Sequence, residues 1–266
     1  MCIRDSTNNN DKYSKIENND VNKMVGNPVL SNPNDIDNAL SSDNLVSLSP
    51  SSGGNRLIWD MRYPGFKSFE GMVLYSSPNV GPKVAPGKYN IKMTYNDQIL
   101  QKEFEIVKDP RVKISQADYE DQLEFLINVR DEVSRANQKI IDIRNIKNNM
   151  IFISEKTRGN IELQEMINDY LTDVSEIENN IHMTKNQSRQ DPLNYGIRIN
   201  NRIAFLLADS QRGDYPPTDQ SKEFFIQVKG ELDSEVMKLD ALIDKHSQKI
   251  ENYLEENKIE LISLNN

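Results

Sequence analysis

The chain has 266 residues, of which 27% are charged and 36% are hydrophobic, and its formal net charge is -9 at pH 7. A chain of this length suggests one or two domains. The acidic balance argues against nucleic acid as a partner, because binding to a phosphate backbone requires a basic surface. No apolar run reaches the roughly 20 residues that span a bilayer, so the sequence predicts no membrane span.

The first 52 residues are predicted to be disordered or a linker. Residues 1–6, MCIRDS, resemble a translated sequencing-adapter fragment of the kind that begins many metagenomic reading frames. We therefore expect that these six residues are an artefact, that Cys2 belongs to it, and that the natural start lies upstream. The rest of the stretch is rich in Asn, Asp and Ser, which favours turns and buries little apolar area.

Residues 53–110 carry the pattern of β-strands. Apolar and polar residues alternate over 56–63, 89–95 and 99–107, and a short apolar run covers 72–75. Asn96-Asp97 has the spacing of a tight hairpin turn. Four such strands predict part of an antiparallel β-sandwich of the immunoglobulin or fibronectin type.

Residues 111–262 are predicted to form an antiparallel four-helix bundle with long helices, which makes the whole chain an α+β multidomain protein. The first helix would begin after Ser115 and end near Gly159. The second carries a heptad seam of apolar residues typical of a coiled coil. Asp191-Pro192 is predicted to start the third helix and Thr218 to cap the fourth. The seam of the second helix consists of Leu163, Ile167, Tyr170, Val174, Ile177 and Ile181.

The strand that contains Trp59 is the first candidate site. Trp59, Asp60, Arg62 and Tyr63 can form a patch that faces a ligand. The alternative, which we weight more heavily, places Trp59 in the sandwich core, since a Trp buries a large area in a small domain. Asp60 would then pair with Arg62 on the other face.

A dense polar stretch before the third helix is the second candidate. It can bind a ligand or a neighbouring domain. The alternative, again the favoured one, is a helix connection whose side chains satisfy backbone groups at two helix ends. Asn200 and Asn201 would extend the same network. The residues of the stretch are Asn186, Gln187, Ser188, Arg189, Gln190 and Asp191.

Catalytic, cofactor and metal sites are not predicted. His182 and His246 are the only histidines, and neither has a Cys or a second His at the spacing of metal ligands. No acid can be assigned to an apolar pocket, and neither a Gly-rich phosphate loop nor a Gly-x-Ser-x-Gly elbow occurs. We therefore expect that this chain is not itself an enzyme.

Several motifs together resemble the C-terminal region of bacterial sortilin-like, BNR-repeat proteins of the glycosyl hydrolase type. The resemblance covers about residues 53–262, and its most specific parts are the first and the last. One departure is Tyr195-Gly196, where the pattern would have a Pro before Ile197-Arg198. The motifs are Trp59-Asp60-x-Arg62-Tyr63-Pro64, Phe69-x-Gly71-Met72, Val84-x-Pro86-Gly87-x-Tyr89, Lys108-Asp109-Pro110-Arg111, Gln116-Ala117-Asp118-Tyr119, Ile127-x-x-Arg130-Asp131 and the stretch 184–203.

The resemblance implies a secreted protein, periplasmic or extracellular, whose β-propeller is not represented in this sequence. It implies a non-catalytic interaction or scaffolding role, with the protein's own propeller, another protein or a second copy as partner. The alternative is an accessory region of a sialidase-like glycosyl hydrolase. The Asp-box repeats of such propellers do not occur here.

Overall fold

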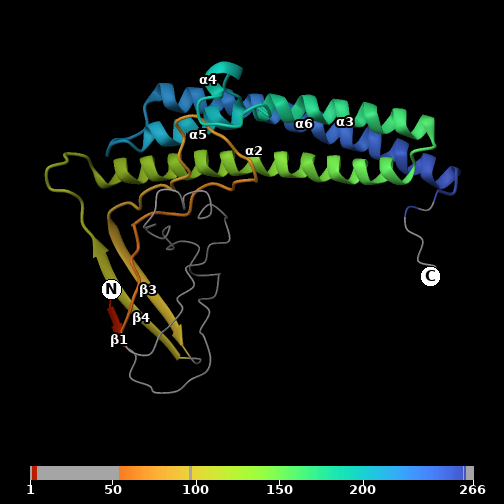
Figure 1. Cartoon of the computed structure of the whole chain (residues 1–266). Helices are drawn as coiled ribbons and strands as arrows, with labels where there is room; N and C mark the ends of the chain where they lie inside the picture. Colours follow the sequence, from red (N-terminus) through yellow and green to blue (C-terminus); the bar gives the residue numbers. More distant parts are fainter. Residues whose placement is uncertain (1, 5–53, 96–97, 260, 262–266) are drawn as a thin grey trace. The chain divides into compact units, whose positions relative to one another are not determined.

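The computed structural model describes residues 2–4, 54–95, 98–259 and 261 (Figure 1). The expectations for residues 5–53 and for the Asn96-Asp97 turn therefore lie outside the described residues. The chain groups into two compact units, and each is described by itself. Unit 1 comprises Met1–Ser68, Pro78–Asp131 and Leu206–Ser221, and unit 2 comprises Phe69–Ser77, Glu132–Phe205 and Lys222–Asn266.

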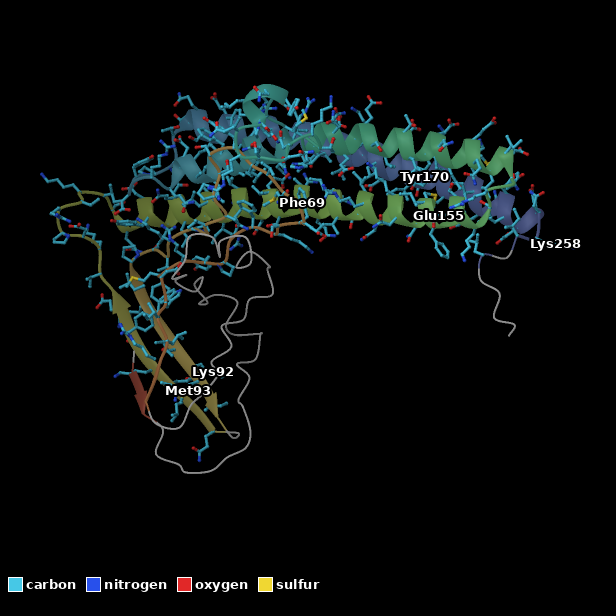
Figure 2. The ribbon with its side chains drawn as sticks, in the orientation of Figure 1. Phe69, Lys92, Met93, Glu155, Tyr170 and Lys258 are labelled. Atoms are coloured by element: carbon cyan, nitrogen blue, oxygen red, sulfur yellow. The ribbon has the colours of Figure 1, made fainter. Side chains whose placement is uncertain are left out.

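A β-hairpin is the main sheet of unit 1. Strands β3 (Gly87–Tyr95) and β4 (Gln98–Ile106) pair antiparallel along their full length, which confirms the last two predicted strands. Tyr89 lies opposite Phe104 in this register, and their rings stack with centroids 5.8 Å apart. Lys92 and Met93 follow on β3, as Figure 2 shows.

The other two predicted strands are wrong in whole or in part. Only Arg56 of the predicted strand 56–63 lies in a strand, β2 (Gly54–Arg56), which pairs with β1 (Cys2–Arg4). The predicted strand 72–75 is irregular. The described residues therefore contain two separate two-stranded sheets, and the protein is a mainly helical chain with a small antiparallel sheet.

Two of the three predicted capping residues make a side-chain capping hydrogen bond. Ser115 and Asp118 cap helix α2 (Gln116–Lys156) reciprocally, with the Ser115 N–H donating to Asp118 Oδ2 over 2.8 Å. Thr218 accepts from the Ser221 N–H over 3.1 Å at the start of α6 (Asp219–Glu256). Helix α3 (Ile161–Ile181) lies where the heptad seam placed it.

The third predicted helix is divided. Pro192 begins a single turn, α4 (Pro192–Tyr195), and the longer helix α5 (Ile199–Ser210) starts later. Gly196 separates the two with a φ of 87°, a left-handed conformation that glycine adopts without the steric penalty of a Cβ. Asp191 is the N-cap residue of α4 and Pro192 follows at the first helical position, as predicted, but the Asp191 side chain makes no capping hydrogen bond to this helix.

Long-range contacts fix the helix directions within unit 2. Gln164 Nε2 donates to the Ser154 carbonyl, and farther from that turn Arg144 pairs with Glu178, so α2 and α3 are antiparallel. Helices α3 and α6 are also antiparallel. Asn180 is hydrogen-bonded to Glu235, whereas Asp173, which is earlier on α3, is bonded to His246, which is later on α6. A bundle of long helices is thus present in unit 2.

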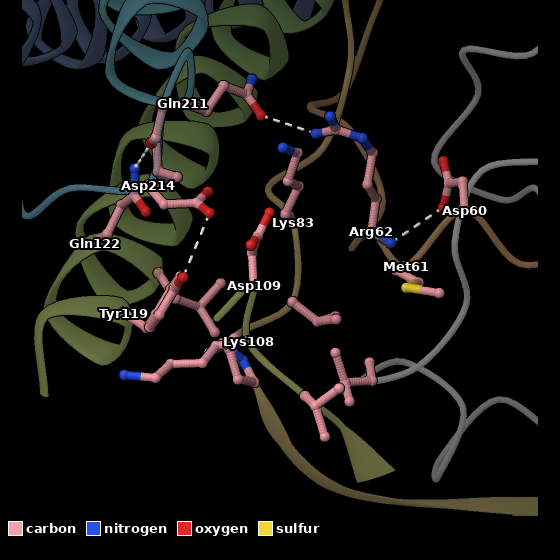
Figure 3. A pocket seen from close by; sticks show the side chains of 18 residues that line it. Asp60, Met61, Arg62, Lys83, Lys108, Asp109, Tyr119, Gln122, Gln211 and Asp214 are labelled. Atoms are coloured by element: carbon pink, nitrogen blue, oxygen red, sulfur yellow. Dashed lines mark hydrogen bonds between the residues drawn. The ribbon is translucent and has the colours of Figure 1, made fainter. Parts of the chain in front are cut away.

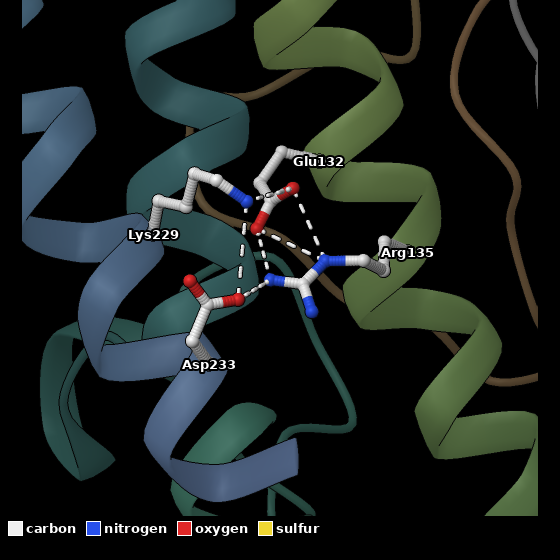
Figure 4. A network of polar contacts seen from close by, with 4 residues as sticks. All are labelled: Glu132, Arg135, Lys229 and Asp233. Carbon is white, nitrogen blue, oxygen red and sulfur yellow. Dashed lines mark hydrogen bonds and ion pairs between the residues drawn. The ribbon is translucent and has the colours of Figure 1, made fainter. Parts of the chain in front are cut away.

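A charge network joins α2 to α6 (Figure 4). The Arg135 guanidinium donates to Glu132 at 2.5 Å and also reaches Asp233 on α6. Lys229 lies 3.5 Å from Glu132 and 3.8 Å from Asp233, which closes the network. Because Glu132 is buried, its two cationic partners offset the cost of removing its carboxylate from water.

Apolar stripes supply the helical core. All six residues of the predicted α3 seam are buried, and Ile140 and Ile143 on α2 are buried with them. Tyr170 of this seam, labelled in Figure 2, lies on α3. Its ring stacks on that of His246 with centroids 4.8 Å apart. No helix in the described ranges has the length and the apolar character that crossing a membrane requires.

Replacing Ile140 by Ala should lower the free energy of unfolding by about 2–4 kcal/mol, because the side chain is fully buried and its loss leaves a cavity. Ile161 is the matched control, since it is 76% exposed and also helical. Ile161→Ala should change stability by less than about 0.5 kcal/mol. Chemical denaturation measures both, and equal losses would contradict the assigned core.

Candidate functional site

The segment around Trp59 packs on the aromatic face of the hairpin. The Trp59 ring meets Tyr89 and Phe104 edge-on, with centroid separations of 6.2 and 6.1 Å. Its Nε1–H donates to the Arg62 carbonyl over 3.1 Å, which satisfies the polar end of the indole. Trp59 therefore packs against the hairpin, and its predicted place in a sandwich core stays a prediction.

Arg62 ties this segment to two other parts of unit 1. Its Nη1 donates to the Gly81 carbonyl over 2.8 Å and to Gln211 Oε1 over 3.0 Å. Asp60 accepts from the backbone N–H of Arg62 over 3.0 Å, so the predicted pairing of the two residues runs through the backbone. Burial raises the pKa of Asp60 and lowers that of Arg62, and the attraction between the two charges opposes both shifts.

A short antiparallel ladder holds residues 61–63 against residues 82–84. The Tyr63 N–H donates to the Pro82 carbonyl over 2.8 Å, and the Val84 N–H donates to the Met61 carbonyl over 2.9 Å. Arg62 and Lys83 lie directly opposite each other in this ladder. Tyr63 therefore contributes to this ladder through its backbone N–H.

A pocket of about 300 Å³ lies beside this ladder (Figure 3). Of the four predicted patch residues, Asp60 and Arg62 line it, whereas Trp59 and Tyr63 do not. On the other side the Tyr119 hydroxyl donates to Asp214 over 3.3 Å, and burial followed by the Asp214 charge raises the pKa of Tyr119. The sequence did not indicate this side, because its residues are far apart in the chain.

Asn201 binds the irregular segment 69–77 of unit 2. Its Oδ1 accepts from the Tyr75 N–H over 2.8 Å, and its Nδ2 donates to the Tyr75 carbonyl over 3.0 Å and to Ser77 Oγ at 3.1 Å. The amide thus provides the two backbone hydrogen bonds that a neighbouring strand would otherwise provide. This explains why the predicted strand at 72–75 does not form.

Asn200 lies in a buried polar cluster with His182 and Asn137. Its Nδ2 is 3.1 Å from Asn137 Oδ1 and 3.2 Å from His182 Nδ1. His182 is only 2% exposed and packs edge-on against Phe69 at 4.9 Å. Burial, with a further contribution from the Arg144 charge, lowers the pKa of His182 to about 4.

Arg144 connects this cluster to a buried carboxylate. Its guanidinium lies 4.7 Å from the Phe69 ring centre, donates to the Glu70 carbonyl over 2.7 Å and pairs with Glu178 at 2.9 Å. Lys147 pairs with Glu178 at 2.5 Å. Burial alone would raise the pKa of Glu178, but the two cations outweigh it and lower the pKa.

The polar stretch 186–191 closes on itself. Asp191 Oδ2 accepts from the backbone N–H groups of Gln187 and Ser188 over 2.7 and 2.8 Å, and these bonds lower the pKa of Asp191. Gln190 is exposed, and Asn186 is buried. The predicted extension of this network to Asn200 and Asn201 is wrong, since those two residues bind His182, Asn137 and the 69–77 segment instead.

The described residues offer no obvious reactive centre. No group of three or more potential metal ligands occurs among residues 2–4, 54–95, 98–259 and 261. The buried charges of unit 2 are compensated by partners, and His182 is neutral at pH 7 because its pKa is lowered to about 4. These arrangements stabilise structure, whereas the pocket of unit 1 has room for a small ligand.

Comparisons with known protein families, with curated proteins and with solved structures found no match. The family resemblance drawn from the sequence motifs therefore stays a prediction.

Acidification should destabilise the protein through His182. Its pKa is about 4 when folded and about 6.5 when unfolded, so the unfolded chain binds more protons between these pH values. Stability should be full above about pH 6.5 and should fall by about 3 kcal/mol as the pH drops to about 4. His182→Gln should remove this part of the pH dependence in denaturation experiments. An unchanged difference between pH 7 and pH 4 would contradict the assignment.

Replacing Asn201 by Leu should cost about 2–4 kcal/mol, because the N–H and C=O groups of Tyr75 lose their partners. Hydrogen exchange at the Tyr75 amide should accelerate more than exchange in the centre of α3. Asn194→Leu is the matched control, since Asn194 is exposed on α4 and should change stability by less than about 0.5 kcal/mol. Unaltered protection of the Tyr75 amide would show that Asn201 does not hold the segment.

Proposed function

We propose that this chain is a non-catalytic interaction and scaffolding region from the C-terminal part of a secreted, sortilin-like β-propeller protein. One observation carries the proposal: residues of the motifs that resemble this family make packing and hydrogen-bond contacts inside each unit. Trp59 and Arg62 do so in unit 1, and Asn200 and Asn201 do so in unit 2. A motif made of packing and linking residues suits a scaffold better than a catalyst.

The proposal includes the finer features of the expected fold. The β3–β4 hairpin would form part of an immunoglobulin-like or fibronectin-like sandwich. Helix α5 would be the fourth member of the bundle with α2, α3 and α6. The protein's own propeller would be one partner, and the location would be periplasmic or extracellular.

A second copy of the chain is the partner that we propose for the bundle. Ile226 and Met237 on α6 are 70% and 72% exposed. They are eleven residues apart, about three helical turns, so they lie on one face of α6. Two large apolar side chains on one helical face are suited to pack against the same face of another copy.

Sedimentation of the full chain over a range of concentrations tests this proposal. The mass should rise with concentration, and Ile226→Gln with Met237→Gln should weaken association by at least about tenfold, since buried apolar side chains often carry more than 1 kcal/mol of binding energy. Ile161→Gln, also on an exposed helical position, should leave association unchanged. A chain that stays monomeric and binds no sortilin-like propeller would refute the scaffolding role.

The alternative role, an accessory region of a glycosyl hydrolase, makes a different prediction. Removing residues 111–266 from such a parent enzyme would change its turnover or its stability. Unchanged values of both would reject the alternative.

A further inference from the structure

The pocket of unit 1 contains two cations in direct opposition. Arg62 and Lys83 are the two residues of an isolated antiparallel bridge, and both line the pocket (Figure 3). Side chains directly opposite each other in such a bridge lie on one face, with Cβ atoms about 4.5–5.5 Å apart. Like charges in this position repel each other, so an anion placed between them would stabilise the ladder.

Neither cation forms a direct ion pair with a described residue, although the nearby Asp60 carboxylate attracts the Arg62 charge. The two acceptors of Arg62 Nη1 are a carbonyl and an amide oxygen, which are neutral. Lys83 is exposed and forms no ion pair with any described residue. Arg62 Nη1 uses both of its N–H groups on these acceptors, which leaves Nε–H and Nη2 for the two-bond contact that a carboxylate makes with arginine.

The other charges of the pocket limit the charge of a ligand. Lys108 adds a third cation, whereas Asp60, Asp109 and Asp214 add three carboxylates. Asp109 is occupied by Arg111, with the closest contact at 2.6 Å, and Asp214 accepts from Tyr119. With Asp109 neutralised by Arg111, the three cations exceed the two remaining carboxylates by one charge, so a ligand with one negative charge fits better than a polyanion.

Aliphatic side chains form part of the remaining wall, beside the polar Tyr119, Gln122 and Gln211, and the space is small. Val84, Ile106, Leu123 and Leu126 line the pocket. A volume of about 300 Å³ is at the lower end of the range for small-molecule sites. The tail of the ligand should therefore be short and aliphatic.

We infer that the pocket binds a free aliphatic monocarboxylate of about six carbons, with its carboxylate between Arg62 and Lys83 and its tail against Leu123 and Leu126. This inference does not depend on the proposed self-association, because it concerns the pocket of unit 1, whereas the self-association concerns Ile226 and Met237 on α6 in unit 2. The charge opposition of the ladder is the observation that carries it.

Titration of the full chain with hexanoate, followed by calorimetry and by NMR, is the test. Hexanoate should bind and shift the resonances of Val84 and Leu123, whereas hexanol and hexylamine should bind at least about tenfold more weakly because they lack the negative charge. Hexyl phosphate should also bind more weakly than hexanoate. Equal binding of hexanol, or no binding of hexanoate at millimolar concentration, would overturn the inference.

Variants of the two cations identify the site. Lys83→Gln should weaken hexanoate about threefold to fivefold, as expected for a partly exposed ion pair, and Lys113→Gln should have no effect, since Lys113 is exposed and outside the pocket. Arg62→Lys keeps the charge but loses the planar fork, so it should weaken binding about tenfold. If Arg62→Lys does not fold, Lys83→Gln decides, because wild-type affinity in that variant would overturn the inference.

Discussion

The backbone of Tyr75 needs hydrogen-bond partners at a place where no strand is available, and the Asn201 side chain provides them. Polar backbone groups removed from water must be paired, and this amide pairs both backbone groups of Tyr75 in the 69–77 segment of unit 2. The segment then places Phe69 against His182 and over Arg144, and it places the Glu70 carbonyl within reach of the same arginine. One helical side chain thus organises an irregular segment and the buried polar cluster beneath it.

Apolar periodicity was enough to predict the helices but not all of the strands. The α3 seam is buried as its heptad spacing predicted, because a helix that packs along its length must repeat its apolar residues. The strand predicted at 72–75 failed for a reason that periodicity does not contain: a side chain 126 residues away replaced the neighbouring strand. Residues 56–63 alternate like a strand, yet only Arg56 at one end belongs to a strand, and the rest pack through Trp59 and pair at the single Arg62–Lys83 bridge.

The sequence predicted which residues belong to the candidate sites, but it did not predict which partners their side chains bind. Trp59 was interpreted as a packing residue because a large aromatic side chain in a strand-rich stretch has few other roles, and its ring packs against the hairpin. The partners of Arg62, Asn200 and Asn201 could not be predicted, since Gln211, His182 and Tyr75 are distant in sequence. Asn137 was a usable signal, because an amide within an apolar helical stripe requires a buried partner, and Asn200 is that partner.

The separation between Tyr75 and Asn201 also has a consequence for the order of folding. Contacts across the α2–α3 turn, such as Gln164 to Ser154, join residues only 10 positions apart, whereas the Tyr75–Asn201 contact spans 126. Closing a long loop costs more conformational entropy than closing a short one, so local contacts form first. We expect the α2–α3 helical hairpin to form early and the 69–77 segment to dock late. In the intermediate, His182 would still meet water and could still take up a proton.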